Sequence, residues 1–359
     1  HEVTVWTTDV FDKKSRIRAD SNPAFIDGVK VFYFRSVPNR LLPEYPLPLS
    51  WDMLHEIRHE ISRFDIVHLH GFRNVQNILL HTHLKRNGIP YVQQAHGSLP
   101  RIGKSGLKWL YDLFWGRKVL KDASKVIAFT ETEAGQYLNA GVSKDKIEVV
   151  PNAINLSQFE DLPAKGEFRR KYNLGTQEKI ILSLGRIHRI KGLDLLAKAL
   201  ARISPELGNV KLVIVGPDSG YLFQLKRVIS QLQIEDRVLF TGPLYDRAKL
   251  EAYVDADVFV LPSVYEASPD TVLEACACGI PVVMTDRCGI AEIFGGEAGF
   301  VVPYDEEQLG DALRNMLTDE PAKQQLGESG RLLVEQRFNL PKIVEQTENI
   351  YKAVVSEKV

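Results

Sequence analysis

The segment that decides the fold reads LPSVYEASPDTVLEACACGIPVV, residues 261–283. It passes from the end of an apolar strand through a polar loop into a helix of small residues, which Gly279 ends before a second apolar strand. Glu266 lies in the loop and Glu274 lies in the second turn of the helix. A helix meant only for burial needs neither carboxylate. The segment therefore predicts a strand–helix–strand unit with a polar site at the mouth of its helix.

The same alternation of strands and helices extends over the whole chain. Strands are expected at 2–7, 29–34, 65–70, 90–94 and 125–129, and again at 179–184, 210–215, 237–241, 258–261, 281–284 and 299–302. Helices are expected in the first half at 51–63, 75–88, 105–120 and 132–139. Strands such as KLVIVG are continuous apolar runs, which is typical of parallel strands covered on both faces. Two such series predict two doubly wound α/β domains.

Pro151 and Asn152 interrupt the pattern between the two series. We therefore expect a first domain over residues 1–151, a second over 152–339, and an amphipathic terminal helix over 340–359. Ligands of open α/β sheets bind at the carboxyl ends of the strands. The expected site is consequently a cleft between the two domains.

Composition narrows the classes of partner. The 359 residues carry 45 Lys and Arg against 46 Asp and Glu, so no overall field attracts nucleic acid, and an anionic ligand must be held by local groups. The three cysteines, Cys276, Cys278 and Cys288, lack zinc-site spacing and indicate reduced thiols in a cytoplasmic protein. No signal peptide is visible, and no apolar run reaches the roughly 18 residues of a membrane span.

A second segment, SLGRIHRIKGLDLL at residues 183–196, follows the first strand of the second series. Arg186 and Lys191 lie between that strand and a helix that opens at Gly192, an arrangement in which cations and free N–H groups can hold phosphate. The alternative is that both are ordinary solvated surface cations. The order Lys-Gly excludes a P-loop, and no G-x-G-x-x-G follows a strand, which weakens a dinucleotide dehydrogenase interpretation.

In the opening segment, Ser268 is predicted as the N-cap and Pro269 as the first helical residue, so that the next N–H groups face the site. Glu266 and Glu274 fall on the same side at helical spacing. Because carboxylates accept paired hydrogen bonds from vicinal hydroxyls, the two glutamates suit a sugar at one end and a ribose at the other. The alternative is one capping glutamate and one glutamate on the helix surface.

The motifs GRIHRIKG, VIVG, FTGPL, ADVFVLPS and EASPDTVLEACACGIPVV together resemble a retaining, nucleotide-sugar-dependent glycosyltransferase of family 4, with GT-B architecture. The resemblance covers nearly the whole chain: VVPNAINLSQF is similar to the family's interdomain segment, and the last helix to the one that crosses back to the first domain. It implies two Rossmann-like domains facing a central cleft. It also implies transfer of a hexose from a UDP or GDP sugar to a hydroxyl of a glycan or lipid-linked acceptor, with no cofactor and no metal.

The resemblance also assigns roles by position. Arg186 and Lys191 would hold the donor diphosphate and stabilise its growing charge, Glu274 would bind the ribose, and Glu266 would orient the transferred sugar without forming a covalent bond. His96, in QQAHGSLP, would reach the sugar and phosphate from the first domain. The rest of the donor pocket would be formed largely by backbone, at Gly216, Gly242, Leu244, Ser268, Pro269, Asp270 and Thr271.

Two departures from the family pattern stand out. The family's commoner Phe-Gly after the first glutamate is here Ser268-Pro269. The first strand and the glycine-rich loop that the resemblance implies do not precede His1, so we expect a chain truncated at its N-terminus and a poorly active protein.

Two other functions stay open. A nucleotide-sugar epimerase or hydrolase of the same architecture would need acid–base groups near the anomeric carbon, and only His96 qualifies. A non-catalytic sugar-nucleotide-binding subunit is the other, although the intact cations and glutamates argue against it.

Three further signals have competing interpretations. Asp255-x-Asp257 resembles a metal-binding pair, but its place favours a helix end and strand entry. His68 and His70 are interpreted as satisfied core or cleft-lining histidines rather than ligands. The stretch LKWLYDLFWGRKVLK, residues 107–121, could lie against the inner face of a membrane that carries a lipid-linked acceptor. We favour the simpler alternative for it, a helix that buries its aromatic rings and exposes its lysines.

Overall fold

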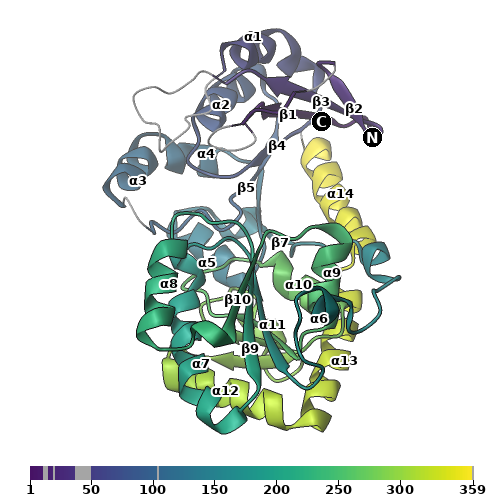
Figure 1. Cartoon of the computed structure of the whole chain (residues 1–359). Coiled ribbons are helices and arrows are strands. Elements are labelled where there is room, and N and C mark those ends of the chain that lie inside the picture. Colours follow the sequence, from purple (N-terminus) through teal and green to yellow (C-terminus); the bar gives the residue numbers. More distant parts are fainter. Residues whose placement is uncertain (11–14, 19–20, 37–49, 103–104, 358–359) are drawn as a thin grey trace. The chain divides into compact units, whose positions relative to one another are not determined.

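The computed structural model describes residues 1–10, 15–18, 21–36, 50–102 and 105–357. The chain divides into two compact units (Figure 1). Unit 1 comprises His1–Ala128, Ala134–Val149 and Glu348–Val359, and unit 2 comprises Phe129–Glu133 and Val150–Thr347. The last helix, α14 (Leu340–Ser356), begins in unit 2 and ends in unit 1. The domain limits expected from the sequence stay predictions.

Unit 2 is built on a six-stranded parallel sheet with the order β10-β9-β8-β11-β12-β13. The strands are β8 (Lys179–Leu184), β9 (Val210–Val215), β10 (Val238–Gly242), β11 (Val258–Leu261), β12 (Val282–Thr285) and β13 (Gly299–Val302). The chain builds outward from β8 to β10, then returns to the other side of β8 to begin β11. This is the doubly wound order, so the prediction for the second half is confirmed.

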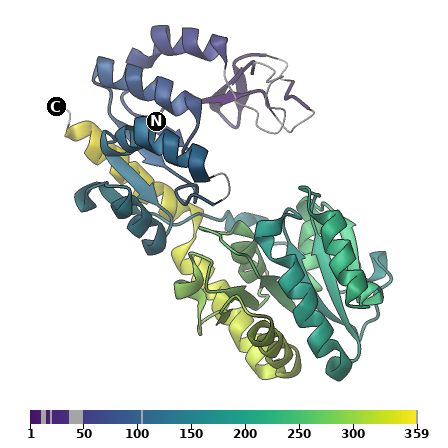
Figure 2. The same ribbon diagram turned by 90° about the vertical axis from the view of Figure 1, so that its left-hand side faces the viewer.

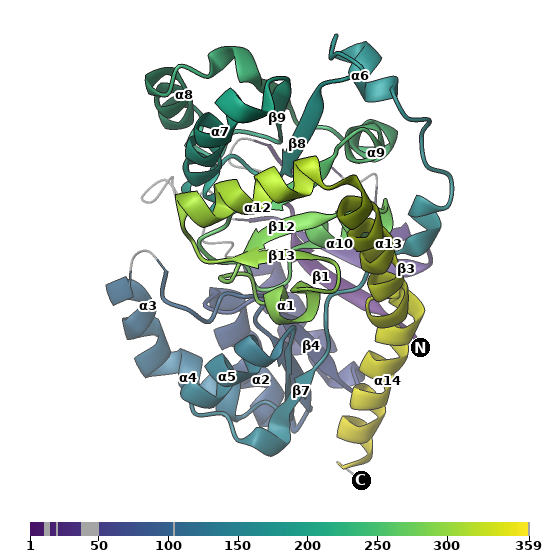
Figure 3. The same cartoon turned by 90° about the horizontal axis from the view of Figure 1, so that it is seen from below.

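Helices cover both faces of this sheet, as Figure 2 shows. Along β8, Ile180 and Leu182 pack into one core layer while Ile181 packs into the opposite one. One layer is completed by α6 (Glu167–Lys171), α9 (Asp246–Val254), α10 (Asp270–Ala277), α11 (Ala291–Phe294) and α13 (Glu320–Arg337). The other is completed by α7 (Leu193–Leu207), α8 (Leu222–Gln231) and α12 (Glu306–Thr318). Figure 3 shows α12 and α13 at the β12–β13 end of this sheet.

The three cysteines belong to the first of these layers. Cys276, Cys278 and Cys288 are free thiols, as the sequence predicts, and all are buried. Burial raises the pKa of Cys278 and of Cys288 to about 12, and it also raises the pKa of Cys276. The thiols are therefore uncharged near neutral pH.

Unit 1 contains two separate sheets where one was expected. The parallel sheet has the order β4-β5-β6-β7, and the other sheet has the order β1-β3-β2. Two of these strands are absent from the sequence prediction. The strands are β1 (Thr4–Thr8), β2 (Ala24–Ile26), β3 (Val29–Phe34), β4 (Val67–His70), β5 (Tyr91–Gln94), β6 (Lys125–Ala128) and β7 (Ile147–Val149).

The two strands that the sequence prediction missed are both short. β2 pairs antiparallel with β3 across Asp27 and Gly28, which have φ angles of 50° and 82°. An Asp-Gly pair with positive φ at both positions is a strong hairpin signal, so this strand could have been found. β7 has three residues and adjoins the expected domain boundary, so the sequence does not separate this strand from the break in the pattern at Pro151.

The helical segment over residues 105–121 contradicts the favoured interpretation. It comprises α3 (Ser105–Tyr111), a π-helical stretch (Asp112–Gly116) and α4 (Arg117–Lys121). Trp109, Phe114 and Trp115 are 50%, 53% and 47% exposed, whereas Asp112 and Gly116 are buried. The aromatic rings therefore lie on the solvent side. The helix turns its polar and small residues inward because Asp112 finds two arginine partners there.

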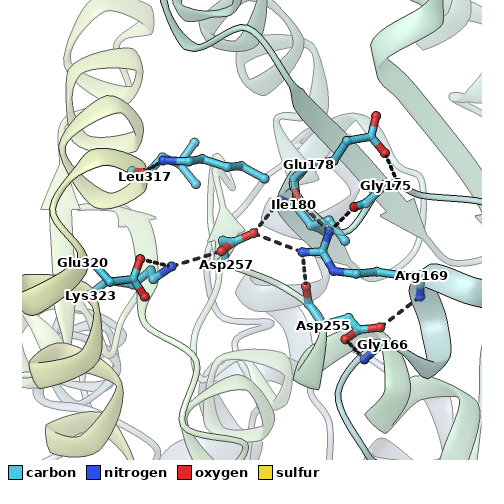
Figure 4. A network of polar contacts seen from close by, with 11 residues as sticks. Gly166, Arg169, Gly175, Glu178, Ile180, Asp255, Asp257, Leu317, Glu320 and Lys323 are labelled. Atoms are coloured by element: carbon cyan, nitrogen blue, oxygen red, sulfur yellow. Dashed lines mark hydrogen bonds and ion pairs between the residues drawn. The ribbon is translucent and has the colours of Figure 1, made fainter.

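The Asp255-x-Asp257 pair is part of a structural network (Figure 4). Asp255, between α9 and β11, accepts hydrogen bonds from the backbone N–H groups of Gly166 and Arg169. Asp257 accepts from the N–H of Ile180 and forms ion pairs with Lys323 at 3.0 Å and with Arg169 at 3.4 Å. The interpretation as a helix end and strand entry is confirmed. That the protein uses no bound metal stays a prediction.

We expect Asp255→Ala to destabilise unit 2 by about 2–3 kcal/mol, because two N–H groups would lose their acceptor in a largely buried place. Urea unfolding followed by circular dichroism measures the change. Asp161→Ala is the matched control, since its side chain is 99% exposed. Equal unfolding midpoints for the two variants would contradict the structural role of Asp255.

Candidate active site

Two loops meet at the point where the strand order of unit 2 reverses. The first follows β8 and contains Lys191 in a single 3-10 turn, Arg189–Lys191. The second follows β11 and contains Glu266. Because β8 and β11 are neighbours whose connections run to opposite sides, their carboxyl ends open a crevice, where α/β sheets bind ligands. The N–H of Val264 donates to the carbonyl of Ile190 at 2.8 Å and joins the two loops.

Lys191 and Glu266 form an ion pair across these loops. The distance from Lys191 Nζ to Glu266 Oε1 is 2.6 Å, and the side chains are 16% and 20% exposed. Ser263 Oγ lies 3.5 Å from the same carboxylate oxygen. The structure thus brings together one predicted cation and one predicted glutamate. Arg186 is exposed and lies in the same loop, outside this ion pair.

Glycines let the loop backbones touch. Gly192 has a φ of 63°, and a Cβ there would lie 1.9 Å from the carbonyl oxygen of Pro262. Gly216, after β9, has a φ of 144°, and a Cβ there would lie 1.9 Å from the carbonyl oxygen of Gly185. The N–H of Gly216 also donates to the carbonyl of Gly242, the last residue of β10, at 2.9 Å. Four successive loops are therefore packed backbone to backbone along one sheet edge.

The predicted nucleoside-side residues lie along this edge. Gly216 and Gly242 are joined by the hydrogen bond just described, and Leu244 packs partly buried against the core. Gly216 is buried, whereas Gly242 and Leu244 are half-buried, and none of the three carries a polar side chain. Their part in binding stays a prediction.

Glu274 lies on α10 and is bound by two residues of α9. Its Oε1 is 2.6 Å from Lys249 Nζ, and its Oε2 accepts from the Tyr253 hydroxyl at 2.9 Å. Burial, and then the neighbouring Glu274 carboxylate, raise the pKa of Tyr253 well above its usual value, so the phenol stays a donor. Sequence reasoning missed Lys249 and Tyr253. Their spacing of four residues places them on one face of α9, but nothing in that spacing points to Glu274.

The start of α10 differs by one residue from the prediction. Helix α10 begins at Asp270 with Pro269 as its N-cap, so the predictions of Ser268 as N-cap and Pro269 as first helical residue are wrong. Pro269 is extended, with a ψ of 114°, and its carbonyl accepts from the N–H of Val272. Among the described residues, Ser268 Oγ and Thr271 Oγ1 are buried without a hydrogen-bond partner. Two such hydroxyls beside a helix N-terminus indicate a place built to meet a polar ligand.

Asp270 connects the two glutamates. Burial raises its pKa, and so do the nearby carboxylates of Glu274 and, more weakly, Glu266. Asn152 Nδ2 donates to Asp270 Oδ1, which opposes that rise and was not anticipated from the sequence. The three carboxylates, four residues apart along the chain, form a row with Lys191 at one end and Lys249 at the other. A row of acceptors between two cations suits a ligand with hydroxyls and phosphate.

His96 lies in unit 1, after β5, in a strained conformation with a φ of 52°. His70 Nδ1 and His96 Nε2 share a hydrogen bond of 2.8 Å, and the His68 ring stacks on His70. His68 Nδ1 contacts the Tyr351 hydroxyl at 2.5 Å, whereas His68 Nε2 is buried without a partner among the described residues and His70 is exposed. His68 is therefore packed as interpreted, and a cleft-lining place for His70 stays a prediction. The expected cleft between domains and the role of His96 in it stay predictions.

The histidine cluster makes stability depend on pH. Burial lowers the pKa of His68 to about 3 and that of His96 to about 4, and the nearby His70 lowers both further. Histidines in the unfolded chain titrate near pH 6.5. Below that pH the unfolded state therefore binds more protons, and stability is lost as the pH falls toward the folded pKa values.

We expect the melting temperature to fall between about pH 7 and pH 5, and His68→Gln to reduce that fall. His68 should dominate because His70 and His96 are exposed to solvent. The exposed His59→Gln is the control, and differential scanning calorimetry is the measurement. Parallel pH curves for the wild type and His68→Gln would refute this account.

The profile for "Glycosyltransferase Family 4" matches residues 1–158, and the profile for "Glycosyl transferases group 1" matches residues 164–333. Together they span almost the whole chain, and the second contains Lys191, Glu266 and Glu274. The chain belongs to the group 1, family 4 glycosyltransferases.

Relatives of this glycosyltransferase cover most of its length. The uncharacterized glycosyltransferase MJ1607 of Methanocaldococcus jannaschii is 28% identical over 345 residues, covering 91% of this chain and 85% of that protein. The D-inositol 3-phosphate glycosyltransferase of Kineococcus radiotolerans is 24% identical over 380 residues, covering 98% and 87%. Among solved structures, Anabaena Alr3699/HepE has a TM-score of 0.76 at 20% identity, covering 91% of this chain and 87% of that one.

These findings confirm the enzyme class and the GT-B fold of two Rossmann-like domains. This glycosyltransferase has no helix, within its described residues, long and apolar enough to cross a membrane.

Proposed function

We propose that this glycosyltransferase moves a hexose from a UDP or GDP sugar to a hydroxyl of a glycan or glycolipid acceptor, with retention of the anomeric configuration. The observation that carries the proposal is the Lys191–Glu266 ion pair at the crevice between β8 and β11, beside the unpaired hydroxyls of Ser268 and Thr271. Anabaena HepE, which shares the fold, was crystallised with UDP and glucose, which supports a nucleotide-sugar donor.

The donor diphosphate would replace Glu266 as the partner of Lys191. Lys191 lies in the loop after β8, and Arg186 is exposed in the same loop, where both cations can meet a diphosphate. The hydroxyls of Ser268 and Thr271 would donate to phosphate or sugar oxygens at the N-terminus of α10. Phosphate binding would thereby satisfy polar groups that the free protein leaves unpaired.

The carboxylates would hold hydroxyls on either side of the diphosphate. Released from Lys191, Glu266 can accept from hydroxyls of the transferred sugar. Glu274 keeps lone pairs for the ribose while Lys249 and Tyr253 fix its orientation. Gly216, Gly242 and Leu244 would line the base, and His96 would contact the sugar from the other domain.

Retention requires that the acceptor approach from the face that the phosphate leaves. The acceptor oxygen forms a bond to the anomeric carbon while the bond from that carbon to the phosphate oxygen breaks. The electron pair of the broken bond stays on the phosphate, which also takes the acceptor's proton. Lys191 and Arg186 would stabilise the charge that grows on the leaving phosphate.

Nucleotide release measured with UDP- and GDP-sugars, with and without acceptors, tests this function. We expect release that depends on an acceptor, and a product with the donor's anomeric configuration by NMR. The acceptor panel should include inositol phosphate, because a relative is named for that acceptor. Equal release without any acceptor would favour a hydrolase, and an inverted product would exclude the proposed stereochemistry.

Glu266 should not become glycosylated during turnover, because its carboxylate is held by a lysine and serves as an acceptor of hydroxyl hydrogen bonds. Intact-mass spectrometry after rapid quenching, with donor alone and with donor plus acceptor, is the measurement. Glu266→Gln is the comparison that removes the charge and keeps the shape. A hexosyl adduct on Glu266 in the wild type would replace this mechanism by a double displacement.

A further inference from the structure

The helical segment of residues 105–121 exposes an apolar face. It lies at the periphery of unit 1 in both Figure 1 and Figure 3. Six large apolar side chains point to solvent from it, between 43% and 68% exposed: Leu107, Trp109, Leu110, Leu113, Phe114 and Trp115. Two of the four tryptophans of the chain are among them. An exposed apolar patch of this kind marks an interaction surface.

Polar contacts on the inner side of the helical segment hold its apolar face toward solvent. The buried Asp112 carboxylate accepts hydrogen bonds from Nε and Nη2 of Arg73, at 2.8 and 2.9 Å, and from Nε of Arg101, at 2.9 Å. The Tyr111 hydroxyl donates to the carbonyl of Asn74 at 3.2 Å. The helix therefore could not roll its apolar side inward without breaking a buried ion pair, which is a costly change.

A glycine completes the inner face. A Cβ at Gly116 would lie 3.0 Å from the Phe72 ring, so the helix approaches the body of unit 1 closely there. The π-helical stretch from Asp112 to Gly116 keeps these two residues inward while the three between them face out. Single π-helical turns of this sort are frequent at functional sites.

The rim of the face is positively charged. Arg117, Lys118 and Lys121 are exposed beside it, and Lys108 is half-buried within it. Asp112 is the sole carboxylate in residues 101–121 of the sequence, and its charge is already paired with two arginines. The whole chain has a net charge of −1, so this excess is local.

An open hollow of about 500 Å³ adjoins the aromatic side chains. Phe114 and Trp115 line it together with cations of α2 (Val75–Asn87) and α4: Lys85, Arg86 and Lys118. Asp122 lines it as well, with its carboxylate bound to Lys85 at 2.7 Å and to His81 at 2.9 Å. Cations beside aromatic rings suit a phosphate headgroup above acyl chains.

We propose that the apolar face of residues 107–115, with its basic rim, docks this glycosyltransferase on an anionic lipid surface. Tryptophan rings prefer the boundary between headgroups and acyl chains, and lysines and arginines are attracted to anionic headgroups. A second copy of the chain fits less well, because a two-fold contact through this face would set cations against cations. The proposal goes beyond the proposed function and does not rest on it.

Co-sedimentation with vesicles tests the proposal. We expect the full chain to bind vesicles of phosphatidylcholine mixed with phosphatidylglycerol, and to bind pure phosphatidylcholine vesicles far less. Raising the salt from roughly 0.05 to 0.5 M should weaken binding, since screening shortens the reach of surface charge. Equal binding to both compositions, or none to either, would overturn the proposal.

Variants locate the surface. Trp109→Ser with Trp115→Ser should lower vesicle binding about tenfold or more, because two rings no longer enter the interface. Arg117→Gln with Lys118→Gln should lower it about fivefold per charge removed. The matched controls are Trp51→Ser, a 66% exposed tryptophan elsewhere in unit 1, and Lys198→Gln, an exposed lysine of unit 2. Neither control should change binding.

Trp109 and Trp115 are half-exposed, and the other substituted side chains are exposed. The melting temperatures of these variants should therefore stay close to the wild-type value. Vesicle binding unaffected by the tryptophan pair would show that another surface docks. Light scattering in the absence of lipid tests the alternative that a second copy of the chain binds this face. Concentration-dependent dimers that the same tryptophan variant abolishes would replace the lipid by a second copy.

Discussion

Replacement of Lys191 by alanine should lower kcat about a hundred- to a thousandfold. Its ammonium is the cation that the fold holds at the crevice between β8 and β11, 2.6 Å from a carboxylate that a donor phosphate would displace. Because the charge on the leaving phosphate grows toward the transition state, the loss should fall on kcat more than on KM for the donor.

Initial rates with the donor and acceptor identified by nucleotide release give both constants. Lys191→Arg keeps the charge in a different shape and should recover part of the activity. Lys198→Ala removes an exposed lysine from the following helix and should leave the rate unchanged. A Lys191→Ala enzyme within threefold of the wild type would remove Lys191 from the catalytic groups.

Replacement of Gly192 by alanine should destabilise unit 2 by about 3–5 kcal/mol and abolish activity. Two costs add. The left-handed conformation, with φ 63° and ψ 26°, strains any side chain, and the new Cβ would lie 1.9 Å from the carbonyl oxygen of Pro262. Since that neighbour is backbone, the loop after β11 must move, and it carries Glu266 with it.

Gly88→Ala separates the two costs. Gly88 ends α2 with nearly the same dihedral angles, φ 63° and ψ 30°, but a Cβ there would have no atom within 4 Å. Urea unfolding should therefore show a loss of only about 1–2 kcal/mol for Gly88→Ala. Similar losses for the two variants would mean that the contact between the loops yields easily.

The alternation of strands and helices was predictable because parallel strands covered on both faces are written as apolar runs. The pairing of Lys191 with Glu266 was predictable too, because each residue follows one of the two neighbouring strands, β8 and β11, at which the strand order reverses. The start of α10 was placed one residue early because Ser-Pro fits two capping schemes, and the extended Pro269 selects the later one.

Other contacts depend on packing between distant segments. Lys249 and Tyr253 reach Glu274 because α9 and α10 pack in the same core layer, and a single sequence does not record that choice. The helix of residues 105–121 has apolar residues on several sides. Asp112 decides which side is buried, through Arg73, which is 39 residues away in the sequence.

The buried cysteines give this chain an advantage for labelling. Cys276, Cys278 and Cys288 are shielded and uncharged near neutral pH, so maleimide dyes should leave the native protein unmodified. Phe25→Cys in unit 1 and Phe223→Cys in unit 2 would place reactive thiols at side chains that are 73% and 75% exposed. Energy transfer between two dyes at these positions would measure the distance between unit 1 and unit 2 as donor sugar is added, with every natural cysteine left in place.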